Sequence, residues 1–131
     1  MHSDVNTLPH SILVVEDDPI ARLIMLKAIE SIGCKVQTAT SVAEALACID
    51  RQVFSLILLD AHLSDGGGWE VARHVRNAQT TFRIPIVAIS SDDSQESIGK
   101  LLNAGVDHFM VKPIHLQQFR SLVAFYLAAT L

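Results

Sequence analysis

Several short apolar runs in this chain are each followed directly by residues that carry a charge or a hydroxyl group. In chain order these residues are Glu16, Asp17 and Asp18, then Asp60, then Ser90 and Ser91, then Lys112. Two carboxylates about 4 Å apart repel each other by roughly 4 kcal/mol at an effective dielectric constant of about 20, so gathered acids must take up protons or hold a cation. A few oxygen ligands suit Mg²⁺, which keeps several waters and accepts phosphate oxygens. With an ammonium and a hydroxyl group added, the set is equipped to handle a phosphoryl group, and an aspartate can itself be the nucleophile.

The apolar runs are typical of strands buried on both faces of a sheet. The strong candidates are Ile12–Val15, Val53–Leu59 and Ile84–Ile89, and the weaker ones are Lys35–Ala39 and Asp107–Val111. Pro85 near the start of its run is tolerated because the first residue of a strand does not need an N–H donor.

Amphipathic stretches between these runs predict helices. Asp18 and Pro19 suit the N-cap and first position of a helix that ends near Gly33. The pairs Ser41 with Glu44 and Asp93 with Glu96 have the spacing of capping boxes. Two further helices are expected over Gly68–Ala78 and His115–Ala129.

Five strands that alternate with five helices predict an α/β fold, a doubly wound parallel sheet with right-handed crossovers. In such a sheet, polar residues just past the carboxyl ends of the strands line the ligand crevice. We therefore expect the acids, Ser90 and Lys112 to converge at one edge. Taken singly, Asp18 fits a helix cap better than a ligand, and Lys112 fits an ordinary surface lysine as well as it fits a site residue. The prediction therefore rests on the whole set.

Composition and charge predict a single folded domain and argue against some classes of protein. The 131 residues are 50% hydrophobic and 18% charged, which predicts one folded domain, here 11–131 after an N-terminal tail of residues 1–10. The formal net charge of −4 argues against direct nucleic-acid binding. Cys34 and Cys48 form no disulfide framework. With no signal peptide and no apolar run of roughly 18–20 residues, we expect a cytoplasmic protein without membrane insertion.

The same residues resemble a known family, the receiver domains of two-component response regulators, typified by the chemotaxis regulator. The resemblance runs from Ser11 to Leu127. It rests on four motifs: Val14-Val15-Glu16-Asp17-Asp18-Pro19, Leu58-Leu59-Asp60 with Gly68 downstream, Ile84-Pro85-Ile86 leading to Ser90, and Val111-Lys112-Pro113. It implies a flavodoxin-like three-layer sandwich with strand order 2-1-3-4-5. It also implies a signalling domain that catalyses its own phosphorylation and dephosphorylation and is not otherwise an enzyme.

The resemblance also implies a role for each site residue. Asp60 matches the phosphoacceptor, and Glu16 and Asp17 match the acidic pair that holds Mg²⁺, with Asp17 the direct ligand and Glu16 acting through water. His62 matches the position whose backbone carbonyl binds the metal, and Lys112, followed by a cis bond to Pro113, matches the lysine that contacts the phosphoryl group. Ser90 and Phe109 match the switch hydroxyl and the switch aromatic. Phosphorylation is then expected to shift the surface formed by the fourth helix, the fifth strand and the fifth helix.

The implied phosphodonor is a histidine kinase or a histidine phosphotransfer protein. The implied output is a downstream protein target or a covalently linked kinase module, with the chain a monomer or weak dimer. The sequence leaves open whether the protein is free-standing or a receiver from a larger hybrid kinase.

The chain also departs from the family pattern. Leu63-Ser64 stands where many members have Met-Pro, and Gly66-Gly67-Gly68 follows, so we expect a freer loop after Asp60. Ser91 replaces a small alanine and is expected to alter access to the phosphoryl group. Phe109 lacks the hydroxyl group of a tyrosine.

Two alternatives remain. A phosphatase of the haloacid-dehalogenase type also uses an aspartate nucleophile and Mg²⁺, but it needs a second acid where this chain has His62. A degenerate receiver that acts without phosphorylation is disfavoured by the complete set of acids, Ser90 and Lys112. The histidines show no zinc-ligand spacing, and no phosphate-binding loop of nucleotide hydrolases occurs.

Overall fold

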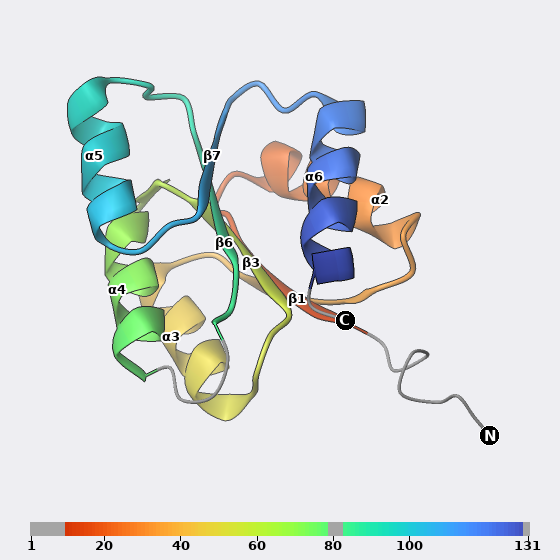
Figure 1. Cartoon of the computed structure of the whole chain (residues 1–131), viewed down its shortest axis with the longest axis horizontal. Helices are drawn as coiled ribbons and strands as arrows, with labels where there is room; N and C mark the ends of the chain where they lie inside the picture. The colour runs from red at the N-terminus through yellow and green to blue at the C-terminus, as the bar shows by residue number, and fades with distance from the viewer. Residues whose placement is uncertain (1–9, 79–82, 130–131) are drawn as a thin grey trace.

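The computed structural model describes residues 10–78 and 83–129, and these form a central sheet with helices on both faces (Figure 1). The five parallel strands of the sheet are β1 (Ser11–Val15), β2 (Lys35–Ala39), β3 (Leu56–Asp60), β6 (Ile86–Ser90) and β7 (His108–Val111). Their spatial order is β2-β1-β3-β6-β7, with every neighbouring pair parallel. This is the expected order 2-1-3-4-5, so the predicted doubly wound sheet is confirmed.

Five helices cover the sheet, as expected: α2 (Pro19–Glu30), α3 (Val42–Arg51), α4 (Gly68–Ala78), α5 (Gln95–Asn103) and α6 (Leu116–Ala129). Figure 1 shows α2 and α6 on one side of the sheet and the other three on the opposite side. Among these described helices, none is long and apolar enough to cross a lipid bilayer.

Alternate side chains of each central strand enter different core layers. Ile12 and Val14 pack with the side chains of α2 and α6, whereas Leu13 and Val15 pack with those of the other three helices. All four are fully buried. A strand covered on both faces cannot alternate apolar with polar residues, which explains the unbroken apolar runs in the sequence.

The boundaries of four strands differ from the expected ones by one to three residues. β1 begins at Ser11, β6 is Ile86–Ser90 and β7 begins at His108. Val53, Phe54 and Ser55 precede β3, whose ladder with β1 starts at the pair Ile12–Leu56. Of the expected tail, residues 1–9 lie outside the described part, and the carbonyl of His10 accepts a hydrogen bond from the N–H of Lys35.

The helix caps confirm some predictions and correct others. Asp18 caps α2 by accepting from the N–H of Ala21, and Ser41 caps α3 by accepting from Glu44. The reciprocal half of that capping box is wrong, because the Glu44 carboxylate accepts from the N–H of Thr40 at 2.7 Å.

The box at Asp93 and Glu96 is also wrong. Ser94 caps α5, and its hydroxyl oxygen accepts from the N–H of Ser97. The Asp92 carboxylate accepts from the N–H of Ser94 at 3.0 Å and holds the preceding turn, so the helix begins one residue later than expected.

A two-stranded hairpin after Asp60 was not predicted. It consists of β4 (His62–Leu63) and β5 (Gly66–Gly67), paired antiparallel. We call His62–Gly67 the β4–β5 hairpin. Leu63 is buried in the core on the side of α3, α4 and α5.

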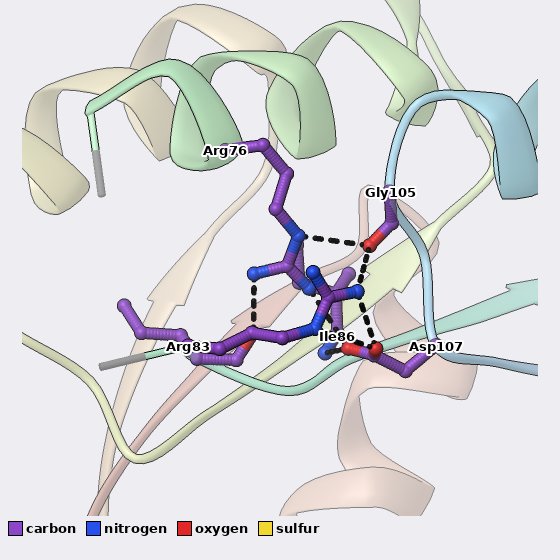
Figure 2. A network of polar contacts seen from close by, with 6 residues as sticks. Arg76, Arg83, Ile86, Gly105 and Asp107 are labelled. Atoms are coloured by element: carbon purple, nitrogen blue, oxygen red, sulfur yellow. Dashed lines mark hydrogen bonds and ion pairs between the residues drawn. The ribbon is translucent and has the colours of Figure 1, made fainter. Parts of the chain in front are cut away.

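Figure 2 shows a polar network at the amino ends of β6 and β7, where Asp107 accepts from two arginines. Arg76, with only 14% of its side chain exposed, also donates to the carbonyl oxygens of Ile84 and Gly105. Arg83 approaches the same carboxylate from solvent, with 55% exposed. The network ties the end of α4 to the segments that lead into both strands.

Candidate functional site

The carboxyl ends of four neighbouring strands bring the predicted site residues to one edge of the sheet. Asp60 and Ser90 are the last residues of β3 and β6. Glu16 and Lys112 directly follow β1 and β7, and their N–H groups continue the backbone ladder by donating to Ala39 and Ser90. Because the strands are parallel, their carboxyl ends and the side chains beyond them share this edge.

The expected acids meet in a tight cluster. Glu16, Asp17 and Asp60 each offer one carboxylate oxygen, and these three atoms lie within 4.8 Å of one another. Glu16 is fully buried and Asp60 is 5% exposed. Their charges are poorly screened by water, so the repulsion between them is strong.

Lys112 supplies the positive charge nearest to the cluster. Its Nζ lies 3.0 Å from Oε1 of Glu16 and 3.6 Å from Oδ2 of Asp60. The bond from Lys112 to Pro113 is cis, as the resemblance implied. One ammonium group therefore faces two of the three carboxylates.

Burial dominates the titration of Glu16. Loss of solvation raises the pKa of Glu16 to about 7, and the neighbouring Asp60 carboxyl adds to the rise, while Lys112 and the N–H of Asp18 oppose it. For Lys112, burial alone lowers the pKa, but the carboxylates of Glu16 and Asp60 outweigh it and raise the pKa overall. In the metal-free protein, Glu16 therefore gives up its proton at a higher pH than an exposed glutamate does.

The buried oxygen of Glu16 shows that the cluster is not satisfied by protein groups. Within the described residues, Oε1 of Glu16 receives no hydrogen bond of acceptable geometry and has only the ion-pair contact with Lys112. An unsatisfied buried carboxylate oxygen beside two more carboxylates is the donor set that a hard divalent cation binds. The residues present thus fit an Mg²⁺ site.

Asp60 is held by the backbone that follows it. Its Oδ1 accepts from the N–H of His62 at 3.1 Å. The first residue of α4, Gly68, lies directly against this turn, and its N–H donates to the carbonyl of Ala61. A Cβ at Gly68 would come within 2.5 Å of the Asp60 carbonyl oxygen, so only glycine fits there.

The two expected switch residues lie on neighbouring strands. Ser90 is fully buried, and its hydroxyl oxygen accepts from the N–H of Asp92 at 3.0 Å. Phe109 is half-buried on β7 and packs against the core on the α3–α4–α5 side. Because the hydroxyl oxygen of Ser90 is the acceptor in its bond with Asp92, the hydroxyl hydrogen is available for a further acceptor.

The His62 and Ser91 side chains lie at the rim of the site. The His62 imidazole is 62% exposed, and its Nε2 lies 3.9 Å from Oδ2 of Asp92. Ser91 is exposed and lines a cavity of about 400 Å³ together with Asp18 and Lys112. The cavity gives solvent access beside the lysine.

Sequence reasoning missed the residues that hold the β4–β5 hairpin. The Asp65 carboxylate accepts from the N–H groups of Val42 and Ala43, and Glu70 accepts from the N–H of Gly67 at 3.0 Å. An aspartate before glycines signals a turn, but no local pattern shows that its partner is a helix more than 20 residues earlier.

Comparison with known proteins gives matches over nearly the whole chain. Residues 12–124 match the family model described as response regulator receiver domain. The hybrid signal transduction histidine kinase L of Dictyostelium discoideum is 31% identical over 129 residues, which cover 94% of this chain but only 8% of that protein.

Two solved structures show the same fold. A CheY-like receiver domain protein from Methanospirillum hungatei has a TM-score of 0.85 at 25% identity, covering 94% of this chain and 97% of that chain. The receiver domain of sensor histidine kinase PA1611 from Pseudomonas aeruginosa, with a magnesium ion coordinated in its active-site cleft, has a TM-score of 0.83 at 24% identity and covers 92% and 99%. The sequence match, the fold and the edge of the sheet that carries the acids lead to one assignment: this chain belongs to the response regulator receiver domain family of two-component systems.

Proposed function

We propose that Asp60 accepts a phosphoryl group from a phosphohistidine on a histidine kinase or a histidine phosphotransfer protein. The observation that carries this proposal is the cluster itself. Three carboxylate oxygens lie within 4.8 Å of one another, and the Lys112 ammonium lies 3.6 Å from Asp60. This combination of a nucleophile, a cation site and a fixed positive charge is what phosphoryl transfer requires.

Asp17 and Asp60 would hold Mg²⁺ through their carboxylates, Glu16 would act through a water molecule, and His62 would contribute its backbone carbonyl. The bound ion supplies positive charge that offsets the charge of the transferring group. The receiver domain of PA1611, which carries magnesium in its cleft, supports this choice of metal. The unsatisfied Oε1 of Glu16 supports it independently.

The protein groups then perform the transfer. A carboxylate oxygen of Asp60 forms a bond to phosphorus as the bond between phosphorus and the histidine nitrogen breaks, and the imidazole leaves with that electron pair. The product is an acyl phosphate. Lys112 pairs with a phosphoryl oxygen, and the hydroxyl hydrogen of Ser90 becomes a donor to another.

The new dianion biases the domain between two packings. Movement of Ser90 toward the phosphoryl group vacates space beside β6, which Phe109 on the adjacent β7 fills. The surface formed by α5, β7 and α6 then shifts and changes its affinity for a downstream protein or a linked kinase module. This is a population shift driven by local electrostatics.

The proposal also includes the cellular compartment and the oligomeric state. Cys34 and Cys48 are both free thiols, which suits a reducing cytoplasm. The chain would act as a monomer or weak dimer. It would contact a histidine kinase or a histidine phosphotransfer protein, because phosphoryl transfer to Asp60 needs a phosphohistidine donor.

The test is phosphorylation of the purified domain by acetyl phosphate and by a phosphorylated kinase, with MgCl₂ or with EDTA. Wild-type protein is expected to gain one Mg²⁺-dependent phosphoryl group, and Asp60→Asn none. Labelling of Asp60→Asn at the wild-type level would refute the assignment of the acceptor. No labelling of the wild type by any donor would instead favour a receiver that acts without phosphorylation.

A further inference from the structure

The β4–β5 hairpin lies between the acceptor and α4 and carries the backbone of His62. Its first N–H, that of His62, donates directly to Oδ1 of Asp60. A displacement of the hairpin therefore moves a hydrogen-bond donor of the acceptor carboxylate and the carbonyl proposed to bind Mg²⁺. Whatever fixes the hairpin also fixes these two groups.

Asp65, at the turn of the hairpin, makes a two-pronged contact with another element. Its Oδ1 accepts from the N–H of Val42 at 2.8 Å, and its Oδ2 accepts from the N–H of Ala43 at 3.1 Å. These N–H groups belong to the first turn of α3, where donors have no partner inside the helix. The two donors lower the pKa of the Asp65 carboxyl, which keeps it ionised at neutral pH.

Ser41 accepts from the next two N–H groups of that helix. Its hydroxyl oxygen accepts from the N–H of Glu44, and its carbonyl accepts from Ala45. The α3 N-terminus is thus capped twice, once by its own N-cap residue and once by a side chain from the hairpin. Only the second cap connects α3 to the phosphorylation site.

The hairpin needs this connection because little else holds its turn. Gly66 and Gly67 have no side chains to pack, and glycine adds backbone freedom. The buried Leu63 holds one strand of the hairpin, and Glu70 holds the N–H of Gly67. Asp65 is the group that ties the turn between them to α3.

We propose that Asp65 is a positioning residue for the phosphorylation site: by anchoring the hairpin on α3, it holds the His62 backbone and Asp60 in the arrangement that binds Mg²⁺. This inference rests on the proposed function, because it assigns a support to the same metal site. It also predicts that the expected looseness of the glycine-rich loop emerges when Asp65 is removed.

The experiment compares Asp65→Ala with Ser41→Ala, its matched control. Both variants remove a cap from α3, but only the first releases the hairpin. Mg²⁺ binding is followed through the fluorescence of Trp69, the only tryptophan, whose ring lies against Gly67. MgCl₂ is titrated in 0.15 M salt, and circular dichroism checks that each variant is folded.

Asp65→Ala is expected to raise the Kd for Mg²⁺ by about three- to tenfold, less than the roughly 10- to 100-fold typical of groups that hold a metal ligand directly. Ser41→Ala should stay within about twofold of wild type, since it leaves the contacts of the hairpin intact. The rate of phosphorylation by acetyl phosphate at low Mg²⁺ should fall in parallel, and excess Mg²⁺ should largely restore it.

A third variant separates anchoring from charge. Asp65→Asn removes the same negative charge as Asp65→Ala but keeps one acceptor oxygen, so its Kd should lie between those of Asp65→Ala and wild type. Equal Kd values for Asp65→Ala and Ser41→Ala, or for Asp65→Asn and Asp65→Ala, would overturn the inference. Should Asp65→Ala not fold, Asp65→Asn must still bind Mg²⁺ more weakly than both Ser41→Ala and wild type. Failure of wild-type protein to bind Mg²⁺ would instead remove the proposed function.

Discussion

Replacing Glu16 with glutamine should change how the stability of the metal-free protein depends on pH. Burial raises the pKa of Glu16 from 4.5 to about 7, and one unit corresponds to about 1.36 kcal/mol. The folded protein therefore binds this proton more tightly than the unfolded chain, by about 3 kcal/mol. The stability that the proton provides is fully present below pH 4.5 and is lost as pH rises to about 7.

The assay is urea unfolding in EDTA at several pH values between about 4.5 and 7.5. The free energy of unfolding of wild type minus that of Glu16→Gln should fall by about 3 kcal/mol across this interval, because glutamine has no proton to lose. The exposed Glu30 provides a control, and Glu30→Gln should follow the wild-type curve. Superimposable pH profiles for wild type and Glu16→Gln, or a difference that grows with pH, would contradict the account of this site.

Magnesium should restore part of the stability that wild type loses as pH rises. Above pH 7, a ligand at tenfold its Kd stabilises the folded state by about 1.4 kcal/mol, and wild type should gain this stabilisation. Glu16→Gln should gain less, since it lacks one of the three carboxylates. Wild type at pH 5.5 should also gain less, because Glu16 is then protonated and the metal must displace that proton.

Three further predictions concern single groups. Gly68→Ala should lower the free energy of unfolding by about 1–3 kcal/mol, because the added Cβ meets backbone atoms. Gly99→Ala in α5, with open space around it, should raise the free energy of unfolding by up to about 1 kcal/mol. Urea unfolding measures both. By the same measurement, Arg76→Ala should cost about 2–4 kcal/mol, since its buried side chain donates to two carbonyl oxygens and to the Asp107 carboxylate. Arg83→Ala should cost less than about 1 kcal/mol, since Arg83 is largely exposed. A larger cost for Arg83→Ala than for Arg76→Ala would contradict this ranking. Lys112→Ala should slow phosphorylation by acetyl phosphate about 100- to 1,000-fold without weakening Mg²⁺ binding, because the variant removes a cation that competes for the same carboxylates.

The fold and the convergence of the site were predictable because their signals are local. An unbroken apolar run marks a strand covered on both faces, and the residue after each run then faces the shared edge of a parallel sheet. Glu16, Asp60 and Lys112 could therefore be brought together without coordinates. Their predicted chemical roles rest on the family resemblance and on the experiments proposed above.

The contacts between distant segments could not be predicted in the same way. Asp65 looks like an ordinary turn residue, and only the folded chain brings it to α3. Arg76 looks like one of several surface charges on α4, although it is mostly buried against Gly105 and Asp107. Even the cap of α5 was misplaced by one residue, because Asp92, Asp93 and Ser94 are all good capping types and the tertiary turn decides among them.

The arginine network lies at the end of β6 and β7 opposite to the acids, and this separation has a consequence for mutagenesis. Substitutions at His62 or Asp92, which contact each other beside the acids, leave the hydrogen bonds of Asp107 in place. Residues at the acidic edge can therefore be exchanged without loss of the bonds that join α4 to the segments entering β6 and β7.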